Sequence, residues 1–480
     1  MDCLSVCGCV ATGSSGNFST TRSNPRTHGC TTLSAWTRCA ACWSATSVAR
    51  GITPASCTSC WSSNSGCSAM PMTRKAEPTR RVFMVLDSVY PSPGGGGAES
   101  QVGTLTGWLA EQGVPSTIVV PMVPWGPQVA HEQQGLVEII RLRYPRLPLV
   151  GGLVLQARLM LLLRRRRREI KAIHCHIAQN MAVASAIINQ RLRKPLIVKL
   201  TGMTELNGGI LDPNPSLSMR LKRTILKQTM IQAISHTLGN RLLDVGFSPA
   251  QVYRIPNAVD LDRFDPQQPH MQALRAQGRP DSDLVVLYVG RLEAVKGLDV
   301  LMDAWMAAFT PEQNVRLLLV GSGSLEETLK QKVSTHGREE QIRFLGRSDN
   351  VAEQLACADL GVLTSYTEGL SNTLLESMAS GLPMIGSRVS GNEDFIQPDV
   401  TGWLFPAGDR EALARCLRQA YRLGRPGLAE MGRAARAFVQ ANASIPTVGN
   451  QLRTIYEGDA WTLTALSELE PHSFPHDSMH

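Results

Sequence analysis

The chain has 480 residues, of which 43% are hydrophobic and 18% charged, and its formal net charge is +8. This length predicts two globular domains of roughly 150 to 200 residues each. No stretch reaches the ~18 to 20 consecutive apolar residues of a spanning helix, so we expect a soluble or membrane-peripheral protein. The positive charge favours anionic partners such as nucleotide phosphates, lipid head groups or nucleic acid.

The first 78 residues differ in composition from the rest. They contain nine of the twelve cysteines, namely Cys3, Cys7, Cys9, Cys30, Cys39, Cys42, Cys57, Cys60 and Cys67. The segment lacks helix or strand periodicity and also lacks the order of a secretion signal. We therefore predict that residues 1–78 are an extension outside the fold, with a native start at Met70 or Met72 as one form of this hypothesis.

A zinc ribbon is the alternative for this segment. Cys39-x2-Cys42 and Cys57-x2-Cys60 lie 14 residues apart, close to the spacing with which two thiolate pairs complete a tetrahedral site. The apolar and charged residues that usually surround such a site are missing, which favours the extension.

From residue 80 onwards the chain alternates between strands and helices. Apolar strands at 82–86 and 116–120 flank a glycine-rich loop, Gly94 to Gly97, and an amphipathic helix, which is the opening of a parallel α/β unit. Such glycines let backbone N–H groups approach a phosphate, although four in a row also suit a flexible turn. Further strands at 172–178 and 195–202 extend this domain over residues 79–264.

An apolar helix predicted at 153–170 ends in five arginines, Arg164 to Arg168. One interpretation is a solvated helix end stabilised by the helix dipole. The other is attachment of a basic, apolar helix to an anionic membrane surface.

A polar linker at 265–283 precedes a second α/β domain, predicted over 284–427. In "YVGRLEAVKGLD" a buried strand is followed by Gly290, Arg291 and Lys296. Cations beyond the carboxyl end of a parallel strand lie where open α/β sheets bind ligands, so they are candidates for holding a pyrophosphate. The alternative is an ordinary surface arginine and lysine.

The stretch "EGLSNTLLESMASGLP" places Glu368 and Glu376 eight positions apart, the first in a loop and the second within a helix. One loop and one helix can thus present two carboxylates to one ligand. Two unrelated surface glutamates are the alternative for this spacing alone.

Together, "IPNAVDLDRF", "YVGRLEAVKGLD", "LVGSGSLEETL", "IRFLGR" and the E-x7-E stretch resemble the nucleotide-sugar-dependent glycosyltransferases of family 4, a retaining group with the GT-B fold. The resemblance covers roughly residues 80–456. It implies an α/β protein with two Rossmann-like doubly wound domains facing a central cleft, the acceptor on the first and the donor on the second. A C-terminal helix at 428–456 would cross back to the first domain, before a tail at 457–480.

The implied activity is that of a hexosyltransferase, which moves a sugar from a nucleotide-diphosphate sugar to a saccharide or lipid-linked acceptor. Surface polysaccharide or lipopolysaccharide synthesis is the implied pathway, in the cytoplasm or on the inner face of the cytoplasmic membrane. No metal, other cofactor, nucleic acid or obligate protein partner is expected. Asp260 and Asp262 in "VDLDRF" are interpreted as structural.

The resemblance also implies roles for single residues. Arg291 and Lys296 match a phosphate clamp, Glu368 would hold hydroxyls of the donor sugar, and these three are the catalytic candidates. Glu376 would accept hydrogen bonds from the ribose. The other donor-binding candidates are Gly95, Gly96, Gly97, Gly290, Gly346, Arg347, Gly369, Leu370, Ser371 and Asn372. The two glutamates are thus not the acid–base pair of a glycosidase, whose carboxylates flank the scissile bond.

One position departs from the family. "KLTG" places Thr201 where many members have a histidine that faces the donor sugar, and threonine is no general base near neutral pH. Glu205 and Lys199 are candidates to replace it. The acceptor-side candidates are Glu99, His176, Thr201 and Glu205. Of the pair in "AIHCHIA", we expect His174 to be packed and His176 to line the cleft, and a zinc site from these two alone is disfavoured.

Two alternatives come from other classes. A nucleotide-sugar 2-epimerase shares the GT-B architecture and would leave the nucleotide on its product. A zinc-dependent nucleic-acid-binding protein would use the cysteines and arginines but would leave the strand-end glycines and the two glutamates unexplained.

Overall fold

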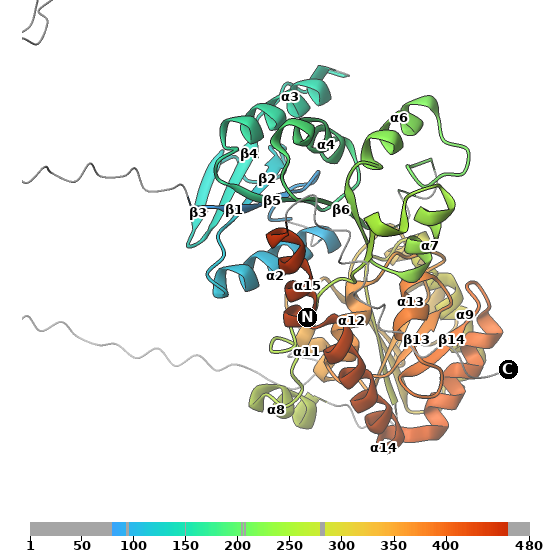
Figure 1. Cartoon of the computed structure of the whole chain (residues 1–480). Coiled ribbons are helices and arrows are strands. Elements are labelled where there is room, and N and C mark those ends of the chain that lie inside the picture. Colours follow the sequence, from blue (N-terminus) through green and yellow to red (C-terminus); the bar gives the residue numbers. More distant parts are fainter. Residues whose placement is uncertain are drawn as a thin grey trace, which may run out of the picture. The chain divides into compact units, whose positions relative to one another are not determined.

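The computed structural model describes residues 79–92, 96–148, 150–202, 205, 208–278 and 284–458. Within them the chain forms two parallel sheets, each covered by helices (Figure 1). The cysteine-rich extension, its zinc-ribbon spacing, the two alternative start positions and Gly95 lie outside the described residues.

The first sheet has eight strands in the order β3-β4-β2-β1-β5-β6-β7-β8, parallel except for β3. Its strands are β1 (Arg81–Val85), β2 (Ser116–Pro121), β3 (His131–Gln134), β4 (Val137–Leu142), β5 (Ile170–Cys175), β6 (Leu196–Leu200), β7 (Met230–Ala233) and β8 (Val252–Arg254). The central strands β1, β2, β5 and β6 are almost wholly buried, as expected for a parallel sheet covered on both faces.

Helices cover both faces of this sheet. They are α2 (Gly97–Glu111), α3 (Val150–Arg165), α4 (Asn180–Leu192), α6 (Leu217–Leu226) and α7 (His236–Asp244). On one face, α3, α4 and α6 pack over side chains such as Phe83 and Val198. On the other face, α2 packs over side chains such as Met84 and Ile197.

The second sheet has six strands, all parallel, in the order β11-β10-β9-β12-β13-β14. They are β9 (Leu284–Val289), β10 (Val315–Val320), β11 (Ile342–Gly346), β12 (Leu360–Leu363), β13 (Met384–Ser387) and β14 (Gly402–Phe405). This is the Rossmann order, in which the chain reverses direction between β9 and β12 and leaves a ligand site at their carboxyl ends.

The helices of this half are α9 (Leu298–Ala308), α10 (Glu326–Thr335), α11 (Val351–Ala356), α12 (Asn372–Ala379) and α13 (Ser390–Phe395). A further helix, α8 (Pro269–Gly278), lies within the stretch that the sequence suggested as a linker.

Two final helices join the halves. α14 (Arg410–Ala443) is broken at Gly424, whose φ is 67°, and packs on the second domain. α15 (Ile445–Glu457) begins after Ser444 and packs on α2 and β5 of the first domain (Figure 1). Close packing there depends on Gly449, because a Cβ at that position would lie 2.5 Å from the Trp108 ring. The predicted helix at 428–456 is therefore two segments with a break at Ser444.

The arginine run differs from its expected form. α3 ends at Arg165, so the helix does not include the whole run. Arg166 turns inward, where it binds Glu138 at 2.7 Å and also contacts Glu169, whereas Arg164, Arg165, Arg167 and Arg168 are exposed. Among the described residues, no helix combines the length and apolarity needed to cross a bilayer.

Candidate active site

An ion pair joins the ends of two neighbouring strands of the second sheet. Lys296 follows β9, and Glu368 lies in the loop between β12 and α12. Because β9 and β12 are parallel neighbours, their carboxyl ends meet, and Lys296 Nζ lies 2.5 Å from Glu368 Oε2. The Ser365 hydroxyl donates a further hydrogen bond to that oxygen at 3.1 Å. Both charged side chains are less than one-fifth exposed, so the pair is partly shielded from solvent.

The turn that carries Lys296 requires a glycine. Gly297 has a φ of 63°, and a Cβ on it would overlap the Thr364 carbonyl oxygen. The Thr364 hydroxyl donates to the Lys296 carbonyl at 2.8 Å and so fixes the turn against the end of β12. Sequence analysis singled out Lys296 but missed Thr364 and Ser365, whose only signal was their place just after a buried strand.

The ends of β9, β10 and β11 pack closely through glycines. The Gly290 N–H donates to Val320, and the Gly321 N–H donates to Gly346, each across neighbouring strand ends. A Cβ on Gly321 would overlap the Gly290 carbonyl oxygen. Gly321 and the two predicted glycines, Gly290 and Gly346, thus bring three strand ends together.

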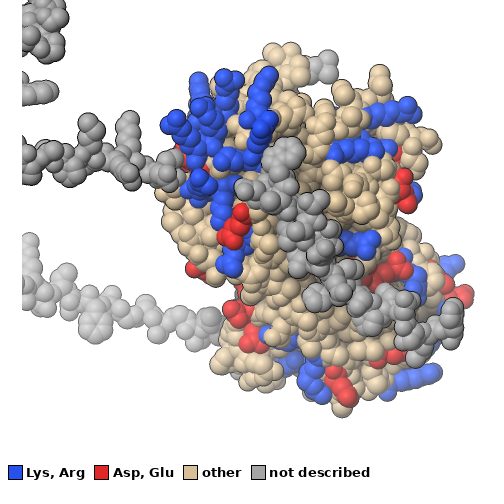
Figure 2. All heavy atoms as spheres, in the orientation of Figure 1, with Lys and Arg blue, Asp and Glu red and all other residues tan. Residues whose placement is uncertain are grey.

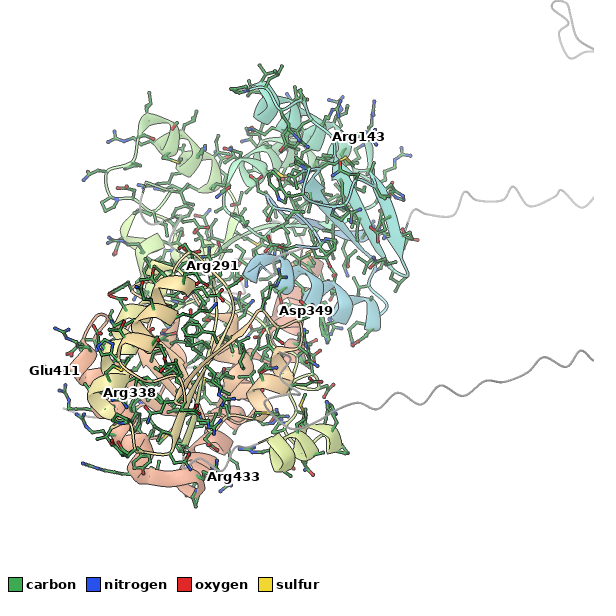
Figure 3. All side chains as sticks on the ribbon, turned by 180° about the vertical axis from the view of Figure 1, so that it is seen from behind. Arg143, Arg291, Arg338, Asp349, Glu411 and Arg433 are labelled. Atoms are coloured by element: carbon green, nitrogen blue, oxygen red, sulfur yellow. The ribbon has the colours of Figure 1, made fainter. Side chains whose placement is uncertain are left out.

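Two arginine side chains beside these glycines make no hydrogen bond to other described residues. Arg291 and Arg347 are exposed, and neither guanidinium donates a hydrogen bond within the described residues. Arg291 lies on the side of the second domain that faces the first, whereas Arg433 lies at the far end (Figure 3). Both guanidiniums are therefore available to an anion.

Glu376 lies within α12 and is partly buried. Burial raises the pKa of its carboxyl group, and the nearby Arg263 opposes this shift. No described residue donates a hydrogen bond to the carboxylate, so both oxygens are open to a ligand with hydroxyl groups.

The N-terminus of α12 has free donors. Ser371 occupies the N-cap position, but its side chain does not cap the helix. Within the described part of the chain, the N–H groups of Gly369, Leu370 and Ser371 donate no hydrogen bond. Free N–H groups and the helix dipole favour an anion here.

A polar network links this helix to the first domain. The Asn372 amide donates to the Gly97 carbonyl at 3.1 Å, and Asn257 donates to Asn372 Oδ1 at 2.9 Å. Gln101 on α2 donates to the same oxygen at 3.3 Å and exchanges two bonds of 2.8 Å with the Ala258 backbone. The predicted residues Gly97 and Asn372 are therefore neighbours, and Gln101 and Asn257, which had no assigned role, hold them there.

A second contact brings the two backbones together. A Cβ on Gly369 would overlap the Thr201 carbonyl oxygen and lie 3.0 Å from Gly202 Cα. The Glu205 carboxylate accepts hydrogen bonds from the Thr201 hydroxyl and the Gly202 N–H, each at 3.1 Å. The "KLTG" segment thus contacts the loop that carries Glu368, and its role in facing the donor stays a prediction.

Both domains match family profiles. Residues 95–263 match the profile described as Glycosyltransferase Family 4, and residues 283–422 match that described as Glycosyl transferases group 1. The chain is a family 4 glycosyltransferase.

Relatives and solved structures agree with this family. The transferase is 29% identical over 377 residues to N-acetyl-alpha-D-glucosaminyl L-malate synthase of Bacillus anthracis, an alignment that covers 76% of this chain and 94% of that protein. It is 26% identical to a GDP-mannose-dependent phosphatidylinositol monomannoside mannosyltransferase of Corynebacterium glutamicum, over 79% and 98% of the two chains. The structure of Anabaena HepE in complex with UDP has the same fold, with a TM-score of 0.64, 20% identity, and 80% and 100% of the chains covered. The fold of the transferase is GT-B, as predicted.

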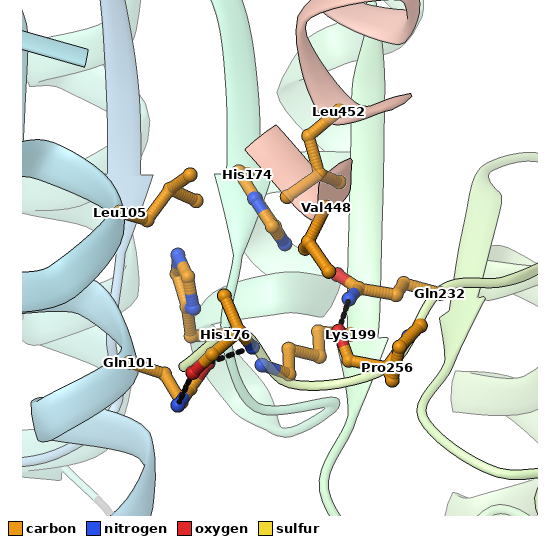
Figure 4. Close-up of a pocket in the computed structure, with 10 residues that line it drawn as sticks. Gln101, Leu105, His174, His176, Lys199, Gln232, Pro256, Val448 and Leu452 are labelled. Atoms are coloured by element: carbon orange, nitrogen blue, oxygen red, sulfur yellow. Dashed lines mark hydrogen bonds between the residues drawn. The ribbon is translucent and has the colours of Figure 1, made fainter. Parts of the chain in front are cut away.

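The transferase has a buried polar cluster beneath α2 and α15 (Figure 4). His174 and His176 stack with ring centroids 4.1 Å apart, and His174 Nδ1 lies 2.6 Å from the Tyr456 hydroxyl. Burial lowers the pKa of His174 to about 3 and that of Lys199 to about 7, and lowers the pKa of His176 well below its usual value. All three side chains are therefore largely uncharged at mildly alkaline pH.

This cluster corrects two expectations. His176 was predicted to line the cleft, but it is 1% exposed and its Nε2 faces Met84 Sδ at 3.3 Å. Lys199 was a candidate to replace the family histidine, but it is 4% exposed and lines the same buried pocket as the two histidines (Figure 4). Side chains alternate across a strand, so Lys199 projects from the face of β6 that α2 and α15 cover.

The other first-domain candidates have structural partners. Glu99 lies in the first turn of α2, accepts a hydrogen bond from Ser88, and folds back over Gly96. Asp260 accepts hydrogen bonds from the backbone of Asp262 and Arg263, which makes a local turn. Among the described residues, no three His, Cys, Asp or Glu side chains are grouped so as to hold a metal.

Proposed function

We propose that the transferase moves a sugar from a nucleotide-diphosphate sugar to a saccharide or lipid-linked acceptor, with retention of anomeric configuration. The observation that carries this proposal is the Lys296–Glu368 pair, which lies at the carboxyl ends of β9 and β12, where a Rossmann-type sheet binds its ligand. The free N–H groups before α12 and the open Glu376 carboxylate adjoin it in sequence.

The leaving group explains the cations. Breaking the bond between sugar and pyrophosphate builds negative charge on phosphate oxygens, so fixed positive charge lowers the barrier more than it stabilises the substrate. Lys296 and Arg291 supply this charge in the proposed mechanism, and the α12 N-terminus adds its N–H donors. With these groups in place, we propose that the reaction needs no metal ion.

The two glutamates have separate tasks in this proposal. Glu368 holds the Lys296 ammonium in position before the donor arrives and accepts hydrogen bonds from the sugar hydroxyls. Glu376 accepts hydrogen bonds from the two ribose hydroxyls, which suits its unpartnered oxygens. HepE has been solved with UDP and with UDP-glucose, which supports a nucleotide-diphosphate sugar as the donor class.

The acceptor class rests on the names of relatives. They include a mannosyltransferase that acts on a phosphatidylinositol mannoside, an amylovoran biosynthesis glycosyltransferase and a putative colanic acid biosynthesis glycosyltransferase. We therefore place the transferase in polysaccharide or glycolipid biosynthesis.

Product analysis tests the proposal. The full chain is incubated with labelled UDP-, GDP- and ADP-sugars and a lipid extract, and products are analysed by mass spectrometry and anomeric NMR couplings. We expect a free nucleoside diphosphate and a glycoside with the donor's anomeric configuration. A product that still carries its nucleotide would instead identify an epimerase, and an inverted glycoside would overturn retention.

A further inference from the structure

Helix α3 has apolar side chains on two opposite faces. Leu155, Leu159 and Leu163 are buried against the first domain. A second row, Leu153, Ala157 and Leu161, has the same spacing of four but is offset by two residues. Two residues turn an α-helix by about 200°, so this row lies on the opposite face. Leu153 is 66% exposed and Leu161 is 45% exposed, so a solvent-facing leucine row lacks a partner within the described residues.

The same layer continues through the next helices. α3 packs against α4, and α4 packs against α6, so the three helices form one surface of the first domain (Figure 1). Leu217 and Leu221, one turn apart on α6, are 83% and 63% exposed, and Ile187 on α4 is exposed as well. Single exposed leucines are ordinary on protein surfaces, whereas several of them on one helical layer make that layer a candidate interaction surface.

The charge of this layer has one sign. α3, α4 and α6, of 16, 13 and 10 residues, contain no Asp or Glu. The stretch from 143 to 168 contains eight arginines and no acidic residue. Lys and Arg side chains gather over this part of the molecule (Figure 2). By contrast, α14 of the second domain carries Glu411 and Glu430 among its arginines.

We propose that the outer face of α3, α4 and α6 is a docking surface for an anionic phospholipid bilayer. Leucines that protrude between exposed arginines match the chemistry of a membrane interface, where apolar side chains enter the acyl region and cations meet anionic head groups. A nucleic acid would need the arginines but not the leucines. This proposal goes beyond the proposed transferase activity. In that activity the first domain binds the acceptor, so the docking surface would place the acceptor-binding domain at a lipid surface.

Vesicle flotation tests this surface without any donor or acceptor. The full chain is mixed with vesicles of phosphatidylcholine alone or with 30% phosphatidylglycerol, at low and high salt. We expect binding to the anionic vesicles that weakens with salt. Leu153→Gln/Leu161→Gln, which keeps the charge, should lower the vesicle partition coefficient at least tenfold, and Arg164→Gln/Arg165→Gln should do the same, at about fivefold per arginine.

Matched controls come from α14. Leu423→Gln removes an exposed leucine, and Arg415→Gln/Arg422→Gln removes two exposed arginines, so both should bind vesicles like wild type. Thermal melting and nucleotide binding show whether each variant is folded. Because vesicle binding is measured without donor or acceptor, a failure of the membrane proposal can be distinguished from a failure of the transferase proposal. Equal binding to neutral and anionic vesicles, no binding, or binding that the leucine pair does not affect would overturn the proposal. The last outcome, together with capture of a DNA duplex, would identify a nucleic-acid surface instead.

Discussion

Lys296 and Glu368 come from different strand ends, 72 positions apart in the sequence, yet their charged atoms lie 2.5 Å apart. The pairing follows from the Rossmann order, which makes β9 and β12 neighbours although two strands separate them in sequence. Gly297 and Thr364 fix the turn that presents the lysine. The cation is therefore positioned by the fold before any ligand arrives.

Lys296→Ala removes this cation. We expect kcat to fall at least 100-fold, because an interaction with charge that develops in the transition state is lost. Stability should fall by about 1 to 3 kcal/mol, since Glu368 stays partly buried without its partner. Steady-state kinetics and urea unfolding measure the two effects. Lys330→Ala, which removes an exposed surface pair, should change neither by much, and wild-type turnover in Lys296→Ala would contradict the assigned role.

Glu376→Gln separates binding from stability. The raised pKa of Glu376 means that the folded chain holds this proton more tightly than the unfolded chain, so the group destabilises the fold as pH rises above about 4.5. The variant should be at least as stable as wild type at pH 7, with a smaller difference at pH 4. Nucleotide affinity should fall at least tenfold, because an amide accepts fewer hydrogen bonds from ribose hydroxyls. Calorimetry at both pH values checks this, with the exposed Glu340→Gln as control.

Gly369→Ala tests the contact between the two backbones. The added Cβ would overlap the Thr201 carbonyl, so the loop of Glu368 must move away from "KLTG". We expect a loss of about 1 to 3 kcal/mol of stability and at least a tenfold loss of kcat. Gly107→Ala is the matched control, because nothing lies within 4 Å of its added Cβ on α2. Activity equal to that of the control would show that the contact is dispensable.

Lys199 gives the fold a pH dependence. Burial lowers its pKa to about 7, so between about pH 7 and 10.5 the unfolded chain binds more protons than the folded chain. The free energy of unfolding should therefore rise with pH through this window. Below pH 7 the buried ammonium destabilises the fold to its full extent. Lys199→Met should be more stable than wild type by about 2 to 4 kcal/mol at pH 6, with the gap closing toward pH 10. Lys330→Met is the surface control. The account would be refuted if the difference in unfolding free energy between Lys199→Met and wild type were constant from pH 6 to 10, or if Lys330→Met showed the same difference.

Much of the second domain was predictable from sequence. Its strands are continuous apolar runs, and glycines and cations follow them at short spacing, so the local pattern made Arg291, Lys296 and the two glutamates candidates. Their roles in donor binding came from the family resemblance. The pairing of Lys296 with Glu368 is a matter of strand order, which the resemblance implied and the structure displays.

The first domain was less predictable. His176 directly follows β5, and Lys199 lies on β6. The alternation of side chains along a strand shows which residues share a face, but not which face a helix covers. That face is closed by α15, which arrives from the far end of the chain and places Tyr456 on His174. Gln101 and Asn257 were missed for a similar reason, because an amide on a helix and one in a loop gain a role only once Asn372 lies between them.

Nucleotide binding tests the central claim most directly. We would measure the thermal shift of the full chain with UDP, GDP and ADP. The variants are wild type, Glu376→Ala, Lys296→Ala and the surface control Lys330→Ala. The comparison shows whether Glu376 and Lys296 bind the nucleotide. We predict that one nucleoside diphosphate raises the Tm of wild type and of the control, with most of the shift lost in the two site variants. No shift with any nucleotide, or a full shift in Glu376→Ala, would contradict the proposed donor site.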